Sequence, residues 1–390
     1  MASWGVALKV ALVHDWLNQV GGAENVLIAL KEIFPDAPVF TSIYDEQRMP
    51  DLMRQWDIRT SVLDRMPGIY RSHQLALPLY PFAWEKFDFS EFDVVLSNKS
   101  GFCHGIITRP KTLHLCYCLT PTRYLWSTAN YLQREGVGKL ERAILTPLLT
   151  LLRVWDQNAA MRVDRFVAIS RAVQHRITKY YRADSTVIYP PINTERFLPS
   201  ETRDYYFIVS RLIPYKRIDL AVEAFTHLGL PLVIAGDGRD RVALEEAAGP
   251  NVRFLGRISD EALNTWMAGA KGFIFPGEED FGITPLEAAS AGVPVIAYAA
   301  GGALDTVIEG QTGTFFDTPD PRALIQAVRR FQTMPFDKAV IRAHAKQFDE
   351  DNFKQQIKEW VEQSYADHCA ALTLPHPFAH TQETTLHGTS

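Results

Sequence analysis

The sequence predicts an α/β protein of two doubly wound, Rossmann-like domains that face each other across a central cleft. Three observations support this fold class. The chain has 390 residues, more than the roughly 250 to 300 that one hydrophobic core usually serves. In both halves, apolar runs of strand length alternate with segments of helical periodicity, as in parallel sheets covered by helices on both faces. Pro190 and Pro191 interrupt this pattern near the middle and indicate a hinge.

The first half contains several short apolar runs that are typical of buried strands, and one clear amphipathic helix. The runs cover residues 8–14, 39–43, 94–97, 113–118 and 166–169. Residues 23–33 have helical periodicity. Because parallel strands separated by helices present their carboxyl ends at one edge, we expect the functional residues of this half at that edge.

The second half repeats the pattern with clearer boundaries. The expected strands are residues 206–209, 232–235, 252–255, 272–275 and 295–297. The expected helices between them are residues 218–227, 241–247, 260–268 and 285–291. Residues 352–366 form a last amphipathic helix that needs a surface to cover, and residues 370–390 lack periodicity and are expected to be disordered.

Composition excludes several classes of protein. The apolar fraction of 47% and the charged fraction of 22% are ordinary for a packed globular chain and argue against disorder. We expect no spanning helix, because no run approaches 18 to 20 uncharged apolar residues. An apolar start interrupted by Lys9, and only four cysteines, favour a cytoplasmic protein with reduced thiols.

The positive charge is concentrated in one region. Residues 99–182 contain 14 Lys or Arg against 4 Asp or Glu, a balance of +10, although the whole chain carries −5. No nucleic-acid-binding motif accompanies these residues. Either this region faces an anionic membrane surface or a phosphorylated lipid, or the charges only solvate helix faces.

The segment 275–292 is the strongest candidate for a functional site. A strand ends, an acidic loop with Glu278, Glu279 and Asp280 follows, and Gly282 allows close backbone approach before a helix opens at Thr284. A helix N-terminus can hold a phosphate or diphosphate. The carboxylates would repel that group unless they bind hydroxyls attached to it, as in a sugar nucleotide. For Glu287, a local capping box with Thr284 is the alternative.

A basic turn follows the first strand of the second half. Arg211, Lys216 and Arg217 precede a helix, where cations are unfavourable unless an anion lies there. Arg211 offers a bidentate fork and Lys216 a point charge, which suits a departing diphosphate. A solvated basic turn is the alternative interpretation.

Two glycine turns are weaker candidates. Gly21 and Gly22 follow the first strand, and Gly236 and Asp237 follow the strand at 232–235, where small residues could admit a flat base. Simple turns would explain both pairs equally well.

These motifs, taken in order, resemble the retaining glycosyltransferases of family 4, which have the GT-B fold. The likeness extends to about residue 366. Its most specific motif is Glu-x7-Glu, present as Glu279 and Glu287; Arg211, Lys216 and the Gly301–Gly302 pair support it. The segments 116–126, 189–191 and 279–282 are similar to those of bacterial O-antigen and exopolysaccharide mannosyltransferases.

The resemblance implies roles for individual residues. Glu279 would hold hydroxyls of the donor sugar, Glu287 the ribose, and Arg211 and Lys216 the diphosphate, so that these two cations and Glu279 form the catalytic set, without a metal ion or a cofactor. The expected donor-binding residues are Gly21, Gly22, Gly236, Asp237, Asp280, Phe281, Gly282, Ile283, Thr284 and Glu287. The expected acceptor-binding residues are Asp15, Thr120 and Arg123.

The resemblance also implies a division of the chain. An acceptor-binding domain would span residues 1–189, a nucleotide-sugar-binding domain residues 190–347, and a crossover helix residues 348–368, before a tail at 369–390. The donor would be a nucleotide sugar, with GDP-mannose favoured and a UDP-sugar possible. The acceptor would be a saccharide, free or linked to undecaprenyl diphosphate, used for surface polysaccharide synthesis at the inner face of the membrane.

One residue departs from the family pattern. Leu119 stands where the family usually has a histidine beside the reacting sugar, and leucine makes no hydrogen bond. A front-face reaction needs no protein nucleophile, so transfer could survive this change. Two alternatives stay open, a non-catalytic sugar-nucleotide-binding subunit and a sugar-nucleotide epimerase of the same fold. A nicotinamide dehydrogenase is disfavoured, because no G-x-G-x-x-G follows the first strand.

The acceptor side is harder to interpret. Residues 68–87 mix aromatic and cationic side chains, and residues 138–153 form a basic, leucine-rich helical pattern. Both suit either a lipid headgroup boundary or ordinary core packing.

Overall fold

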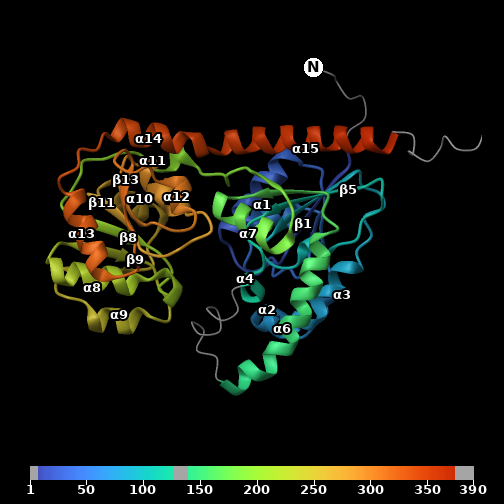
Figure 1. The fold of residues 1–390 in the computed structure, drawn as a ribbon, viewed down its shortest axis with the longest axis horizontal. Helices are drawn as coiled ribbons and strands as arrows, with labels where there is room; N and C mark the ends of the chain where they lie inside the picture. Colours follow the sequence, from blue (N-terminus) through green and yellow to red (C-terminus); the bar gives the residue numbers. More distant parts are fainter. Residues whose placement is uncertain (1–7, 127–138, 374–390) are drawn as a thin grey trace, which may run out of the picture.

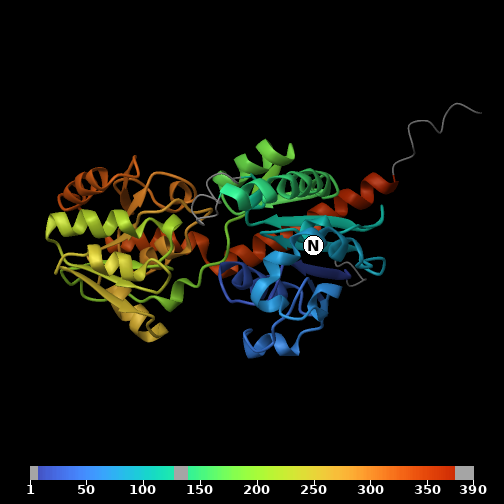
Figure 2. The ribbon, with the colours of Figure 1, turned by 90° about the horizontal axis from the view of Figure 1, so that it is seen from below.

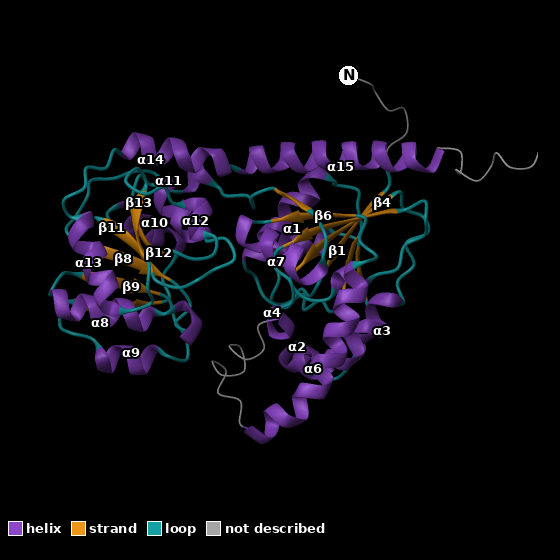
Figure 3. Cartoon of the chain, viewed as in Figure 1, coloured by secondary structure: helices purple, strands orange, loops and turns teal. Residues whose placement is uncertain are grey.

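The computed structural model describes residues 8–126 and 139–373, and these residues form two α/β domains (Figure 1). Each domain is built around one parallel sheet with helices on both faces, as Figure 3 shows. The predicted fold class is therefore confirmed. The tail predicted at 369–390 lies outside the described residues from residue 374 onward.

The first domain contains a seven-stranded sheet in the order β3-β2-β1-β4-β5-β6-β7, and its neighbouring strands pair in parallel. The strands are β1 (Val10–His14), β2 (Val39–Thr41), β3 (Ile58–Thr60), β4 (Val94–Lys99), β5 (Leu113–Cys118), β6 (Arg165–Ala168) and β7 (Ser185–Val187). Strands β3 and β7 were not predicted. Both are three-residue edge strands with half-buried or exposed residues, so they carry no continuous apolar run.

The helices of the first domain differ widely in length. They are α1 (Gly22–Ile33), α2 (Ile69–Ser72), α3 (Tyr80–Glu85), α4 (Arg123–Trp126), α6 (Lys139–Ala160) and α7 (Arg171–Tyr181). The segment at 68–87 is largely core: Tyr80 and Trp84 are fully buried, whereas Phe82 is 67% exposed. Core packing therefore explains most of its aromatic residues.

The second domain contains a six-stranded parallel sheet in the order β10-β9-β8-β11-β12-β13. Its strands are β8 (Tyr206–Val209), β9 (Leu232–Ala235), β10 (Val252–Gly256), β11 (Gly272–Phe275), β12 (Val295–Tyr298) and β13 (Gly313–Phe316). Its helices are α8 (Ile218–Leu228), α9 (Arg241–Ala247), α10 (Asp260–Ala268), α11 (Ile283–Ser290), α12 (Ala303–Thr306), α13 (Pro321–Phe331) and α14 (Lys338–Ala345). Strand β13 and helices α12 to α14 were not predicted.

The last helix, α15 (Glu350–Thr373), runs from the second domain along the first (Figures 1 and 2). Phe353, Ile357 and Val361 are buried in the same core as the strands of the first sheet, and the ring of Phe353 lies 5.6 Å from that of Tyr117. The helix continues beyond the predicted residues 352–366. None of the described helices is long and apolar enough to cross a membrane.

Both sheets reverse their strand order at a central pair of strands. The reversal lies between β1 and β4 in the first sheet and between β8 and β11 in the second. Doubly wound sheets bind ligands at the carboxyl ends of such pairs. Trp16 and Ser100, which follow the first pair, and Phe275, which ends β11, line one common cavity. The two expected binding edges therefore face one cleft.

Candidate functional site

Two adjoining cavities occupy the cleft. The first, of about 640 Å³, lies within the second domain at the ends of β8, β9 and β11. The second, of about 950 Å³, is lined by both domains. Five residues border both cavities, which places them at the junction: Arg211, Lys216, Phe275, Glu279 and Thr284. The catalytic set predicted from the sequence therefore lies at this junction.

The first cavity is shaped by glycine. Gly236 has φ of +120°, and a Cβ atom there would lie 1.9 Å from the carbonyl oxygen of Ser210. Only glycine fits this close approach of the turns after β8 and β9. Gly236 and Asp237 both line the first cavity, and their contact with a donor base stays a prediction.

The second glycine position opens the helix at the junction. Gly282 has φ of +97° and is the N-cap of α11, which begins at Ile283 rather than at Thr284. Gly282 makes no side-chain cap, so the alternative of a Thr284–Glu287 capping box is not formed. The free N-terminal amides and the dipole of α11 are directed at the cleft, where an anion is favoured.

An ion pair joins the basic turn to the acidic loop. Lys216 Nζ contacts Glu279 Oε1, and the Glu279 side chain is 14% exposed. Arg211 Nη2 donates to the Tyr215 hydroxyl at 3.0 Å, and Lys216 Nζ lies 5.2 Å from the centroid of the Tyr215 ring. The cations that we expect at a diphosphate are thus held beside the carboxylate that we expect at the sugar.

Asp280 joins the two domains. Its Oδ2 accepts from Arg123 Nε at 3.0 Å and lies 2.6 Å from Arg123 Nη2, while its Oδ1 contacts Arg176 Nη1. Burial opposes ionisation of Asp280, but the two guanidinium groups outweigh it and hold the pKa of this carboxyl below its usual value. Arg176 Nη2 also reaches Glu278 Oε1 at 3.1 Å. Each of the three acidic loop residues therefore contacts at least one cationic side chain.

Glu287 lies one turn after Thr284 on α11 but borders neither of the two cavities. It is half-buried. Burial raises its pKa to about 7; Arg196 opposes this shift and Asp260 adds to it. With a pKa of about 7, the carboxyl group of Glu287 is protonated in about half of the molecules at pH 7.

The remaining predicted donor residues divide between the domains. Phe281, Gly282 and Ile283 line the second cavity together with Gly22. A Cβ atom on Gly22 would lie 2.9 Å from Ile283 Cδ1, so this glycine allows close contact between the domains. Gly21 is the N-cap of α1 and is not among the lining residues.

The predicted acceptor residues differ in accessibility. Asp15 is 1% exposed, and its carboxylate accepts from the backbone amides of residues 100–103 at 2.5 to 2.8 Å. It holds the loop after β4 rather than facing the cavity. Thr120 and Arg123 do line the second cavity, as does Leu119. An apolar side chain thus occupies the wall where the resemblance places a histidine.

Two contributors to the site were not predicted from the sequence. Arg176 belongs to the basic region at 99–182, and the ring of Tyr215 lies 5.7 Å from Arg123 Cζ. The signal for Tyr215 was its place between Arg211 and Lys216. No local signal marked Arg176, because its partners lie more than 100 residues away.

Two family models match consecutive parts of the chain. The model described as Glycosyltransferase Family 4 matches residues 20–196, and that described as Glycosyl transferases group 1 matches residues 191–348. Among curated relatives, a "GDP-mannose-dependent alpha-mannosyltransferase" of Mycolicibacterium smegmatis is 33% identical over 202 residues, covering 48% of this chain and 52% of that protein. "Alpha-1,3/1,6-mannosyltransferase ALG2" of Homo sapiens is 26% identical, covering 70% of this chain and 73% of that protein.

The match covers only about half of the first relatives' length, 52% for the mannosyltransferase and 54% for a "D-inositol 3-phosphate glycosyltransferase" of Streptomyces avermitilis. Solved structures support the fold over a longer span. Anabaena Alr3699/HepE in complex with UDP covers 91% of this chain and all of its own, with a TM-score of 0.65 and 18% identity. Sucrose-phosphate synthase from Thermosynechococcus elongatus covers 92% and all of its own, with a TM-score of 0.68 and 18% identity. Matched by the two family models across residues 20–348, the chain belongs to the glycosyltransferases of family 4, with the GT-B fold.

Proposed function

We propose that this protein is a retaining hexosyltransferase that moves a sugar, with mannose favoured, from a nucleotide sugar to a saccharide or lipid-linked saccharide. One observation carries the proposal: Arg211, Lys216, Glu279 and the N-terminus of α11 at Thr284 line the junction of the two cavities together, with Lys216 paired to Glu279. Positive groups beside a carboxylate suit a ligand with a diphosphate at one end and hydroxyls at the other. A nucleotide sugar has this chemistry.

The arrangement would favour departure of the nucleoside diphosphate. As the bond from the anomeric carbon to the diphosphate oxygen breaks, negative charge grows on the leaving group, and Arg211, Lys216 and the α11 amides stabilise it. Glu279 would orient sugar hydroxyls. The acceptor hydroxyl oxygen would form its bond to the anomeric carbon on the face from which the diphosphate departs, which gives retention, and the departing diphosphate would take the hydroxyl proton. These cations supply the positive charge that a metal would otherwise provide, so we propose a metal-independent reaction.

The donor choice follows from the relatives. Two of them are named for GDP-mannose or mannose transfer, whereas the HepE structures contain UDP or UDP-glucose. We therefore propose GDP-mannose as the first donor to test, with UDP-sugars as the comparison.

The acceptor would enter from the second cavity. Its first-domain wall is apolar, with Trp16, Leu77, Leu119 and Leu149 among its lining residues. On α6, Leu151 and Val154 are 70% and 56% exposed. We propose that α6 meets the inner membrane surface and that the acceptor is linked to undecaprenyl diphosphate. Arg153, one of the cations of this helix, donates to the carbonyl oxygen of Leu125 and also serves the fold.

One observation favours a second function. Leu119 lines the cavity at the position where the resemblance places a histidine, and its side chain makes no hydrogen bond. A subunit that binds the sugar nucleotide without transferring it is therefore the alternative. Such a protein would bind a donor yet release no nucleoside diphosphate.

The test is release of nucleoside diphosphate from a panel of GDP- and UDP-sugars, with and without acceptor, beside thermal-shift binding. Glu279→Ala and Lys216→Ala should each abolish release, while Lys271→Ala, which removes only a surface pair with Asp204, should not. EDTA should leave the rate unchanged. Binding without release for every donor and acceptor would favour the binding subunit, unless Leu119→His restores turnover.

A further inference from the structure

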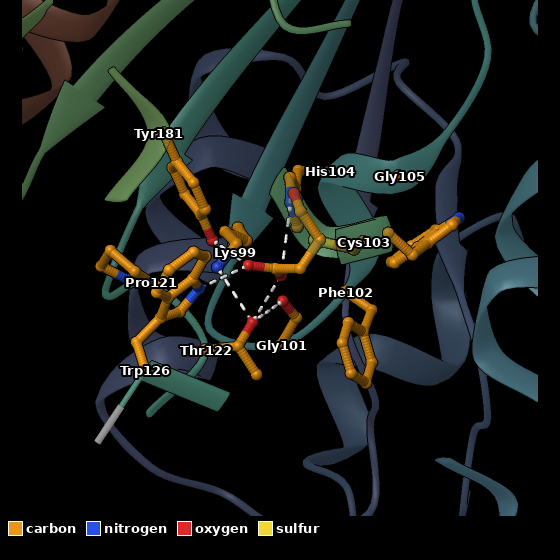
Figure 4. Close-up of polar contacts among 12 residues, drawn as sticks. Lys99, Gly101, Phe102, Cys103, His104, Gly105, Pro121, Thr122, Trp126 and Tyr181 are labelled. Atoms are coloured by element: carbon orange, nitrogen blue, oxygen red, sulfur yellow. Dashed lines mark hydrogen bonds and ion pairs between the residues drawn. The ribbon is translucent and has the colours of Figure 1, made fainter. Parts of the chain in front are cut away.

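A cluster of buried polar side chains lies beneath the segment from Thr120 to Trp126, which borders the cleft on the first domain (Figure 4). Lys99, at the end of β4, is 0% exposed, and Asp156, on α6, is also 0% exposed. Thr122 is buried between them. Burying two charges costs several kcal/mol for each unless hydrogen bonds and opposite charge compensate, so the contacts of this cluster are informative.

Lys99 holds the start of the segment. Its Nζ donates to the carbonyl oxygen of Thr120 at 3.0 Å and to the Thr122 hydroxyl at 3.3 Å. Burial would lower the pKa of Lys99, but the charge of Asp156 is the main influence that raises it above its usual value. The ammonium group therefore stays charged where water does not reach.

Asp156 holds the end of the segment. Its Oδ2 accepts from Trp126 Nε1 at 2.7 Å and from the Tyr181 hydroxyl at 2.9 Å, and its Oδ1 lies 2.9 Å from the Thr122 hydroxyl. That hydroxyl is also 2.7 Å from the carbonyl oxygen of Gly101. Thr122 thus bridges the cation and the anion, and Figure 4 shows Lys99, Thr122, Trp126 and Tyr181 pointing toward one another.

The residue that this cluster places is Arg123. It lies between two tethered residues, Thr122 and Trp126, on α4, and its guanidinium crosses the cleft to Asp280. It also lies 3.9 Å from Glu279 Oε2. A one-ångström shift of the backbone at Thr122 would carry Arg123 out of hydrogen-bond range of Asp280, because hydrogen bonds weaken steeply beyond roughly 3.2 Å.

We propose that Lys99, Thr122 and Asp156 are positioning residues that fix the segment from Thr120 to Trp126 and thereby hold Arg123 at the carboxylates of the donor site. Their effect on the reaction passes through Arg123. The inference rests on the proposed function only for its kinetic readout, and a second readout does not need catalysis.

A purely structural role for the cluster would give a different result when the cluster and Arg123 are changed together. If the cluster only stabilised the first domain, its loss would lower stability and act on turnover independently of Arg123. If it acts through Arg123, its loss should matter little once Arg123 is gone, because two changes in one chain of contacts are not additive.

Thr122→Val is the sharpest probe, since it removes the bridging hydroxyl at nearly constant volume. Lys99→Met would leave Asp156 as a buried unpaired charge, so we expect misfolding to obscure the effect of this substitution on the reaction. Thr112→Val is the matched control: Thr112 is 1% exposed, and its hydroxyl donates to the carbonyl oxygen of Phe92, away from the cleft residues.

The kinetic arm is a double-mutant cycle on kcat/KM of the full chain with its donor. We expect Thr122→Val to lower kcat/KM about tenfold, the value of one hydrogen bond within a charged network. Arg123→Ala should lower it by about 30-fold, and the double variant should match Arg123→Ala within about twofold. A product of the two effects, about 300-fold, or an unchanged kcat/KM for Thr122→Val, would overturn the proposal.

The second arm measures hydrogen exchange. The amides of Leu125 and Trp126 both donate to the Thr122 carbonyl oxygen, at 3.0 and 3.2 Å. Thr122→Val should speed their exchange at least tenfold, whereas Thr112→Val should not. Unchanged exchange would refute the positioning role even if the kinetic effects were seen. A wild-type protein that releases no nucleoside diphosphate would refute the proposed function alone, and exchange would still decide the positioning.

Discussion

Asp280 offers a direct test of how the two domains are held together. The substitution Asp280→Asn keeps the shape of the side chain but removes the charge that Arg123 and Arg176 share from the first domain. Both arginines would then lack their main counter-charge at the cleft. We call the arrangement in which Asp280 contacts both arginines closed; it should become less favourable relative to an open one, in which these contacts are lost and the guanidinium groups are hydrated.

The free-energy change expected for Asp280→Asn follows from how exposed the three paired side chains are. The side chain of Asp280 is 12% exposed, that of Arg176 27% and that of Arg123 38%. Exposed pairs contribute at most about 1 kcal/mol, and breaking a buried pair costs about 3 to 5 kcal/mol. An intermediate loss of about 2 kcal/mol corresponds to a shift of about 30-fold in the ratio of closed to open molecules.

The assay combines small-angle scattering of the ligand-free protein with steady-state kinetics. We expect a larger radius of gyration and a lower kcat/KM, by up to about 30-fold, with part of the loss recovered at saturating donor if the donor favours closure. Asp204→Asn, which breaks an exposed pair with Lys271, is the control and should change neither. An unchanged radius together with a kcat/KM within twofold of wild type would refute the reasoning.

Three further predictions concern single residues. Gly236→Ala should abolish donor binding in calorimetry, because the added Cβ meets the Ser210 carbonyl oxygen, whereas Gly229→Ala shares the positive φ in open space and should cost only some stability. Glu287→Gln should stabilise the protein at pH 8 by up to about 3 kcal/mol in denaturant unfolding, because the folded-state pKa of Glu287, about 7, exceeds the ordinary value of 4.5. Leu119→His should raise the rate of nucleoside diphosphate release if the missing hydrogen bond limits turnover.

The sign of the Glu287 effect follows from linkage. A raised carboxyl pKa means that the folded state binds more protons between pH 4.5 and 7, so its stabilising contribution is complete below pH 4.5 and is lost as the pH rises through 7. The wild type should therefore lose stability relative to Glu287→Gln over this range. A constant difference between the two proteins across pH 4 to 8 would contradict the assignment. Equal binding losses in Gly236→Ala and Gly229→Ala would contradict the steric argument.

Burial on both faces explains which elements could be predicted. Strands β5, β8, β9 and β11 have the expected bounds, because a strand covered on both faces is a continuous apolar run in the sequence. The edge strand β3 has no such signal. Helix α13 is different: Leu324, Ala327, Val328 and Phe331 recur at helical spacing and are buried, so the sequence carries its signal although the helix was not predicted.

By itself, the sequence determined the alternation of strands and helices and the motifs that place Arg211, Lys216 and Glu279 after parallel strands. Those features depend on neighbours within about ten residues. Only the tertiary structure decided that Arg176 meets Asp280, that Asp15 serves a backbone loop and that Thr122 bridges Lys99 to Asp156. The physical reason is that such contacts join residues about 20 to 100 positions apart, and their geometry is set by how the sheets pack and how the domains meet.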